Sequence, residues 1–134
     1  MIIGPVFRDD EPDAYYANIL TELLAAVPEF VTIFDGEDAE DPFMVVGEFS
    51  RFLIASHSTP ALFQKGMDFI NKSFQLGGQN THYLLWVQVF ESVDDHKEVL
   101  PQFASHLSPD ARTLFEAYQQ ACIETRNRFL KQGP

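Results

Sequence analysis

Apolar side chains recur along this chain at intervals of three and four residues, the spacing that places them on one face of an α-helix. The longest series follows Pro109 and contains Ala111, Leu114, Phe115, Tyr118, Ala121, Cys122, Thr125 and Phe129. Residues 80–93 are rich in aromatic and β-branched side chains and have a strand as the alternative. Because no other segment offers a partner strand, we predict a helix there as well.

Helix-start signals divide the chain into segments. A residue that can cap a helix precedes a proline at Asp41-Pro42, Thr59-Pro60 and Ser108-Pro109, and this pair is typical of a first helical turn. Gly77-Gly78 is expected to end the helix before it, and Pro101 to lie in a first turn or to kink its helix. The predicted helices cover residues 12–26, 28–34, 42–56, 60–75 and 80–93, a segment around 99–107, and the long segment after Pro109.

These segments predict an all-α fold, a single-domain antiparallel bundle of six to seven helices joined by short loops. Neither a repeat nor a break in composition divides the chain, so we expect residues 1–134 to form a single domain. Residues 1–10 are expected to form an N-terminal arm, residues 35–41 an acidic loop, and residues 132–134 a tail.

The composition supports a packed core without covalent reinforcement. The chain has 134 residues, of which 46% are apolar and 13 are Phe, and we expect most of these rings to be packed in the core. A single cysteine excludes an internal disulfide framework and a multi-cysteine zinc site. Cys122 lies on the apolar stripe of the last predicted helix, so we expect a buried, structural thiol.

Acidic side chains are concentrated in the first third of the chain. The formal net charge is −11, and the window from residue 9 to residue 48 holds 12 acidic residues and no Lys or Arg. This balance argues against binding to nucleic acid and to anionic membranes, both of which attract cationic side chains. The window has two interpretations: carboxylates that cap helices and keep the domain soluble, or an interaction surface for a basic partner.

Little in the sequence predicts catalysis. Phosphate-binding loops, dinucleotide fingerprints, nucleophile elbows and His-Glu-x-x-His helices are absent, and we predict no catalytic residue, metal or cofactor. A metal site at Glu91, Asp94, Asp95 and His96 is the alternative. However, Asp95 followed by Glu98 has the pattern of a capping box for the next helix, which is the simpler interpretation.

We also find no targeting signal and no membrane-spanning stretch in the sequence. Residues 1–7 are apolar but short and lack a positively charged start, unlike a secretory signal. The longest uncharged stretch, residues 73–90, is interrupted by Gly77-Gly78-Gln79-Asn80 and is not expected to span a membrane. We therefore expect a soluble, cytoplasmic protein.

In these overall properties (small, acidic, all-helical, with carboxylates in one segment and no catalytic signature) the chain resembles the bacterial immunity proteins that neutralise toxin domains. The resemblance implies a non-catalytic module that binds a basic protein partner, such as a secreted toxin domain. Steering by the acidic segment and aromatic anchors beside it would hold that partner. The expected partner-binding residues are Asp9, Asp10, Glu11, Asp13, Tyr15, Tyr16, Asp35, Glu37, Asp38, Glu40, Asp41 and Glu48.

Two other functions remain open at this point. The first is a small metal-dependent helical enzyme that uses Glu91, Asp94, Asp95 and His96. The second is a helical adaptor subunit that binds through an apolar face, whose complex would be insensitive to salt.

Overall fold

The computed structural model describes residues 13–34, 36–37 and 39–131, and within these ranges the regular secondary structure is entirely helical. The all-α prediction is therefore confirmed. The elements are α1 (Ala14–Ala17), α2 (Ile19–Ala26), η1 (Pro28–Thr32), α3 (Pro42–Ala55), α4 (Pro60–Leu76), α5 (Gln79–Leu85), η2 (Trp86–Phe90), α6 (Glu91–Asp94), α7 (Leu100–His106) and α8 (Pro109–Lys131).

The predicted helix starts at the three prolines are confirmed. Asp41 caps α3 by accepting a hydrogen bond from the Phe43 backbone N–H at 3.0 Å. The Ser108 hydroxyl accepts one from Ala111 at 3.4 Å at the start of α8. Thr59 precedes α4 without a side-chain capping bond, so Pro60 alone marks that start by its fixed φ.

Two local predictions were wrong. The expected helix over residues 12–26 is broken at Asn18, whose backbone N–H turns back to Tyr15 while its side chain donates to the Ala14 carbonyl. The capping box at Asp95 and Glu98 does not form, because α7 begins at Leu100 with Val99 in the cap position. There, the backbone N–H groups of Val99 and Leu100 both bond to the His96 carbonyl.

The helix predicted over residues 80–93 contains a π-helical stretch. Its first part is α5 and its last part α6, and η2 between them is a π-helix of five residues. All three parts have helical backbone angles where they join, so they form one continuous helix. A π turn holds one residue more than an α turn and is found mainly at single points within α-helices.

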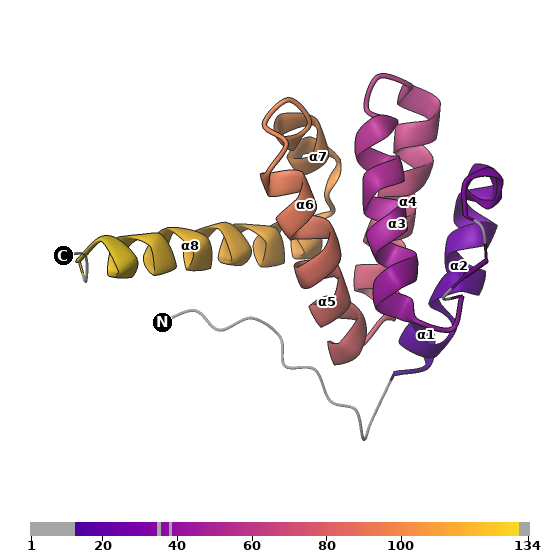
Figure 1. Ribbon diagram of the computed structural model, residues 1–134, viewed down its shortest axis with the longest axis horizontal. Helices are drawn as coiled ribbons and strands as arrows, with labels where there is room; N and C mark the ends of the chain where they lie inside the picture. The colour runs from indigo at the N-terminus through magenta and orange to yellow at the C-terminus, as the bar shows by residue number, and fades with distance from the viewer. Residues whose placement is uncertain (1–12, 35, 38, 132–134) are drawn as a thin grey trace.

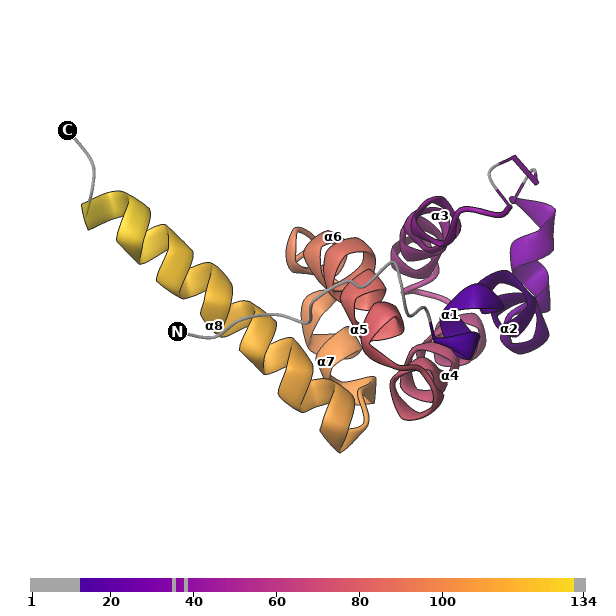
Figure 2. The same cartoon turned by 90° about the horizontal axis from the view of Figure 1, so that it is seen from below.

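The helices form two groups around this continuous helix (Figure 1). Helices α3 and α4 lie side by side, with α1 and α2 against them on one flank and α5, η2 and α6 on the other (Figure 1). Helix α8 crosses the body instead of running along it, and it contacts η2 and α4 (Figures 1 and 2). Its C-terminal half extends away from the other helices.

Phenylalanine fills the core, as predicted for most of these rings. Phe90 is fully buried in η2, and its ring centroid lies 4.9 Å from that of Phe115 and 5.8 Å from those of Phe74 and Tyr118. A second aromatic group surrounds Phe49, whose ring lies 5.1 Å from that of Phe69 in α4. The Phe90 group holds α8 to the body.

Asp13 connects the first helix to the middle of the chain. Its carboxylate caps α1 by accepting from the Tyr16 backbone N–H at 2.7 Å. It also accepts from the Thr81 backbone N–H at 3.1 Å and the Thr81 hydroxyl at 2.9 Å, near the start of α5. The burial of Asp13 by itself would raise its pKa, but these hydrogen bonds outweigh that effect and hold the pKa below the ordinary value of 3.8.

We expect Asp13→Asn to lower the free energy of unfolding at pH 7 by about 2 kcal/mol. The two Thr81 bonds use different carboxylate oxygens, and because the amide nitrogen that replaces one oxygen cannot accept, at least one of these bonds is lost. A carboxyl group whose pKa is lowered by folding stabilises the fold above its unfolded pKa. That contribution disappears as the pH falls through the lowered, folded pKa. The deficit of the variant should therefore shrink below pH 4, as measured by urea unfolding from about pH 7 to pH 2.5. Asp68→Asn, on the exposed side of α4, is the control; a deficit independent of pH would contradict the assignment.

Candidate protein-interaction site

The apolar stripe of α8 continues beyond the helices that cover it. Ala111 and Phe115 are buried against the body and Tyr118 is 7% exposed, whereas Phe129 is 77% and Leu130 70% exposed. At about 1.5 Å per residue, the 23 residues of α8 span roughly 35 Å, longer than any neighbouring helix. The second half of the stripe is therefore left facing outwards.

The prediction of a buried Cys122 was wrong for this reason. The thiol is exposed, although its position in the 3–4 pattern is the same as that of the buried residues before it. Periodicity identifies the apolar face of a helix. It does not tell how far along the helix a neighbour covers that face.

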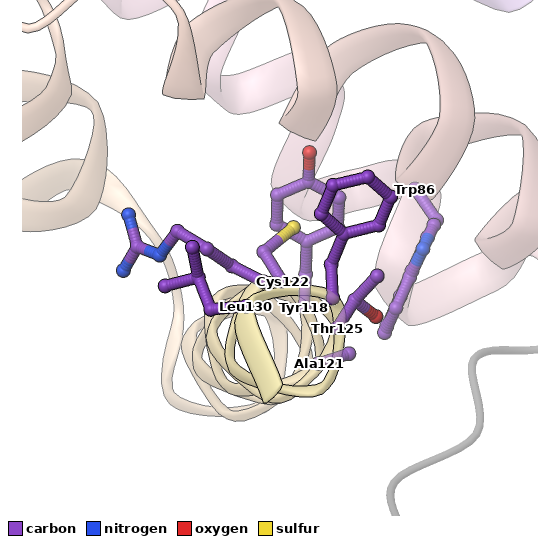
Figure 3. A pocket seen from close by; sticks show the side chains of 8 residues that line it. Trp86, Tyr118, Ala121, Cys122, Thr125 and Leu130 are labelled. Carbon is purple, nitrogen blue, oxygen red and sulfur yellow. The ribbon is translucent and has the colours of Figure 1, made fainter. Parts of the chain in front are cut away.

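A hollow between distal α8 and η2, hereafter the distal groove, is the most apolar of the hollows described. Figure 3 shows Trp86 facing the α8 side chains from the neighbouring helix. Trp86 and Tyr118 meet edge to face with their ring centroids 5.3 Å apart. The groove is lined by Trp86, Tyr118, Ala121, Cys122, Thr125, Arg126, Phe129 and Leu130.

Tyr118 connects the distal groove to the core. Its ring also packs against Phe90, at 5.8 Å between centroids, so that part of the groove is held by the buried aromatic group. Burial and the adjacent Cys122 raise the pKa of Tyr118 well above its ordinary value of 10.0. The phenol therefore stays neutral throughout the physiological range, and the part of the groove near the body is uncharged.

Arg126 is the charged member of the groove lining, and it borders a second hollow on the other side of α8. That hollow also contains Cys122, Ile123 and Leu100, with Asp94 and Lys97 paired at 3.8 Å. From residue 124 to residue 131 the helix has one acidic residue and three basic residues, Arg126, Arg128 and Lys131. The exposed end of α8 thus combines an apolar face with positive charge.

The predicted partner-binding residues are dispersed in the structure. Asp9, Asp10, Glu11, Asp35 and Asp38 lie outside the described residues. Asp13 and Asp41 cap α1 and α3. Tyr15 is buried, which raises its pKa, and its hydroxyl lies 2.9 Å from that of Ser73. Tyr16 is half-buried and packs against the core. The structure thus gives both aromatic anchors, and two of the carboxylates, roles in holding the fold.

Other carboxylates of the acidic window form ion pairs. Glu48 lies 2.6 Å from Arg51, Glu29 2.7 Å from Lys65, and Glu22 3.3 Å from Lys72. Glu37 and Glu40 remain exposed in the loop before α3. Glu40 and Asp41 border a shallow, open hollow there together with Gly36 and Ala39. Within the described part of the acidic window, this loop therefore places Glu37, Glu40 and Asp41 close together in sequence on an exposed segment.

The alternative metal site at Glu91, Asp94, Asp95 and His96 is not assembled. His96 Nδ1 lies 2.8 Å from the Ser92 carbonyl, and Asp94 pairs with Lys97. In the described part of the chain, no group of three or more His, Cys, Asp or Glu side chains is placed to hold a metal ion. Within the same residues, no helix is both long enough and apolar enough to cross a membrane.

Fold and site together define a small all-α domain with an exposed apolar helix end. The family model described as "Domain of unknown function (DUF7674)" matches residues 20–123, and the chain belongs to this family. The match ends within α8, so residues 124–131 of the distal groove region lie beyond it. No curated protein and no solved structure matches the chain.

The sequence reasoning missed the distal groove. The predicted site residues did not include Trp86, Arg126, Phe129 and Leu130. The prediction was based on charge, whereas these residues are marked by uncovered apolar surface. The length of the last predicted helix could have indicated this site. Its apolar stripe after Pro109 runs for five turns, which is further than the shorter predicted helices can cover.

Proposed function

We propose that this protein is a non-catalytic protein-interaction domain that holds an apolar, acidic polypeptide segment of its partner in the distal groove. The observation that carries the proposal is the exposure of Phe129 and Leu130, at 77% and 70%, beside the Trp86–Tyr118 pair. Tryptophan, tyrosine and arginine are the side chains that most often dominate binding energy at protein interfaces. Here Trp86, Tyr118 and Arg126 line the same hollow.

The charge at this end of α8 specifies the chemistry of the partner segment. Arg126 lines the groove, and the segment around it carries a local excess of two positive charges. A bidentate bond to a carboxylate is the strongest use of an arginine side chain at such a site. In an apolar segment followed by acidic residues, the apolar side chains would therefore fill the groove and a carboxylate would bind Arg126.

The test is a comparison of two double variants in affinity capture from the source cells, with cross-linking. Phe129→Asp with Leu130→Asp should abolish capture of a partner that the unmodified protein binds. Val31→Asp with Ile33→Asp, which alters apolar residues that are also more than half exposed (61% and 52%) on and beside η1, should leave capture intact. The cross-linked peptide should be apolar and acidic; equal capture by both variants, or none by the unmodified protein, would remove the proposal.

A second candidate function rests on the acidic loop. Five of the seven residues at positions 35–41 are acidic, and Glu37 and Glu40 are exposed on it. This observation favours the immunity-type function, in which a cytoplasmic protein neutralises a basic toxin domain by electrostatic recognition.

We expect Glu37→Lys with Glu40→Lys to weaken binding of a basic partner by about tenfold or more at low salt, because opposite charges become like charges. The loss should diminish as salt rises. Glu116→Lys with Glu124→Lys, on α8, supplies the same charge change away from the loop. Asp41 is left unchanged because it caps α3. Isothermal titration of the unmodified protein and the two double variants decides the question, and equal losses from both pairs would mean that the loop carboxylates serve only solvation.

A further inference from the structure

The described chain begins close to the helix that carries Trp86. Asp13 is bonded to Thr81 near the start of α5, and Trp86 lies five residues further along the same continuous helix. Five helical residues rise about 8 Å. The 12 residues that precede Asp13 can span up to about 40 Å when extended, so this segment has ample length to reach the distal groove.

The chemistry of residues 1–12 matches that of the groove. The segment begins with apolar side chains, among them Ile2, Ile3, Val6 and Phe7. After Arg8 come the acidic residues Asp9, Asp10 and Glu11, so the side chains of residues 1–12 carry a net charge of −2. The groove has apolar walls that suit the first part of the segment, and Arg126 can pair with one of the carboxylates.

Charge also favours this occupant over a second copy of the chain. Two copies that met through distal α8 would bring the same basic residues, Arg126 and Arg128, into one interface. Each copy further carries a net charge of −11, which opposes association of the whole molecules. A segment tethered within the same molecule has an effective concentration in the millimolar range, so it occupies the groove without these penalties.

We propose that residues 1–12 dock in the distal groove of their own chain and compete there with the partner segment. The docking is inferred from the lining of the groove and from the attachment of the segment at Asp13. Its regulatory role rests on the proposed function. A partner then binds by displacing the N-terminal segment, so that its apparent affinity is reduced by the fraction of molecules in which the groove is occupied.

The groove contains its own reporters, because Trp86 is the single tryptophan and Cys122 the single cysteine of the chain. The experiment compares the full chain with a chain that lacks residues 1–11, which retains Asp13 and its bonds to Thr81. Removal of the segment should shift Trp86 emission to longer wavelength and make the Cys122 thiol react several-fold faster with a disulfide reagent. A synthetic peptide of residues 1–12 added in trans should reverse both changes.

Full-length variants control for changes caused by truncation itself. Ile2→Asp with Phe7→Asp should reproduce the effect of the deletion, whereas Gly4→Ser with Pro5→Ala, which keeps the apolar side chains, should behave like the unmodified chain. Urea unfolding of each variant confirms that the fold is retained. Unchanged Trp86 emission and Cys122 reactivity after deletion would overturn the proposal. Protection that disappears on dilution would do so too, since it would identify a second copy as the occupant.

The two proposals fail separately. If the deletion changes both reporters but no partner binds either chain, the segment docks and the proposed function is wrong. If a partner binds both chains with equal affinity and the reporters do not respond to the deletion, the interaction site stands and the docking is overturned. If both hold, the shortened chain should bind the partner several-fold more tightly than the full chain.

Discussion

Replacing Phe90 by alanine should lower the free energy of unfolding by about 3–5 kcal/mol. The ring is fully buried and contacts aromatic rings from three other helices: Phe74 in α4, Phe103 in α7, and Phe115 and Tyr118 in α8. Alanine removes most of these contacts at once, and the surrounding helices cannot all move inwards to fill the cavity. Chemical denaturation, followed by the far-ultraviolet helix signal, measures the loss.

Phe129→Ala is the matched control, because it deletes the same atoms from a ring that is 77% exposed. It should lower the free energy of unfolding by no more than about 1 kcal/mol, even where residues 1–12 are docked on the ring. Similar losses from the two variants would mean that Phe129 is covered in solution as completely as Phe90, whether by residues 1–12 or by a partner.

The second large effect is expected at Gly77, between α4 and α5. A Cβ atom there would lie 2.5 Å from the Thr81 side chain and 2.6 Å from the Ser73 carbonyl oxygen. Both obstacles are fixed, since Thr81 is bonded to Asp13 and the Ser73 carbonyl accepts the Gly77 N–H at 2.9 Å. We expect Gly77→Ala to cost about 3 kcal/mol, the upper part of the range for forced overpacking.

A substitution at Gly36 is the control that distinguishes steric crowding from backbone strain. The φ of Gly36 is +88°, which alanine adopts unwillingly, but a Cβ atom would meet nothing within 4 Å. Gly36→Ala should therefore cost only about 1 kcal/mol, the penalty for a left-handed backbone. If Gly77→Ala proved equally mild in thermal unfolding, the close approach of α4 and α5 would have to be more adaptable than these distances imply.

Helix positions were predictable because the signals that set them are local. Pro42, Pro60 and Pro109 begin their helices whatever lies around them, and the predicted segments agree with α3, α4 and α8 to within a residue or two. Gly77 ends α4 as expected, although through close contact with Thr81 and not through a left-handed cap.

The π-helical stretch at Trp86–Phe90 lies at tertiary contacts that the local pattern does not contain, whereas the break at Asn18 is accompanied by local hydrogen bonds to Tyr15 and Ala14. Trp86 and Phe90 both reach Tyr118 of α8, a contact between residues more than 25 positions apart in the chain. The apolar pattern within residues 80–93 is compatible with a regular helix and with the observed one.

The candidate site could not be predicted from charge for a related reason. A carboxylate in the sequence has the same formal charge whether it caps a helix, pairs with a lysine or faces solvent. Asp13 bonds to Thr81 and Glu29 pairs with Lys65 only because the fold brings these distant residues to them. The exposure of distal α8 could not be predicted from the sequence either, because the coverage of a helix depends on the lengths of its neighbours.

The π-helical stretch lets the helix from α5 to α6 hold one residue more than a regular α-helix between the same end points would. Removing a single residue between positions 86 and 90 would allow a regular α-helix. Because the wider π turn absorbs the additional residue, the helix on either side would keep its orientation, and Val93, now fully buried, would still face the core. Among relatives of this chain, we therefore expect one-residue deletions within this helix to fall in the segment 86–90 and to coincide with a regular α-helix there.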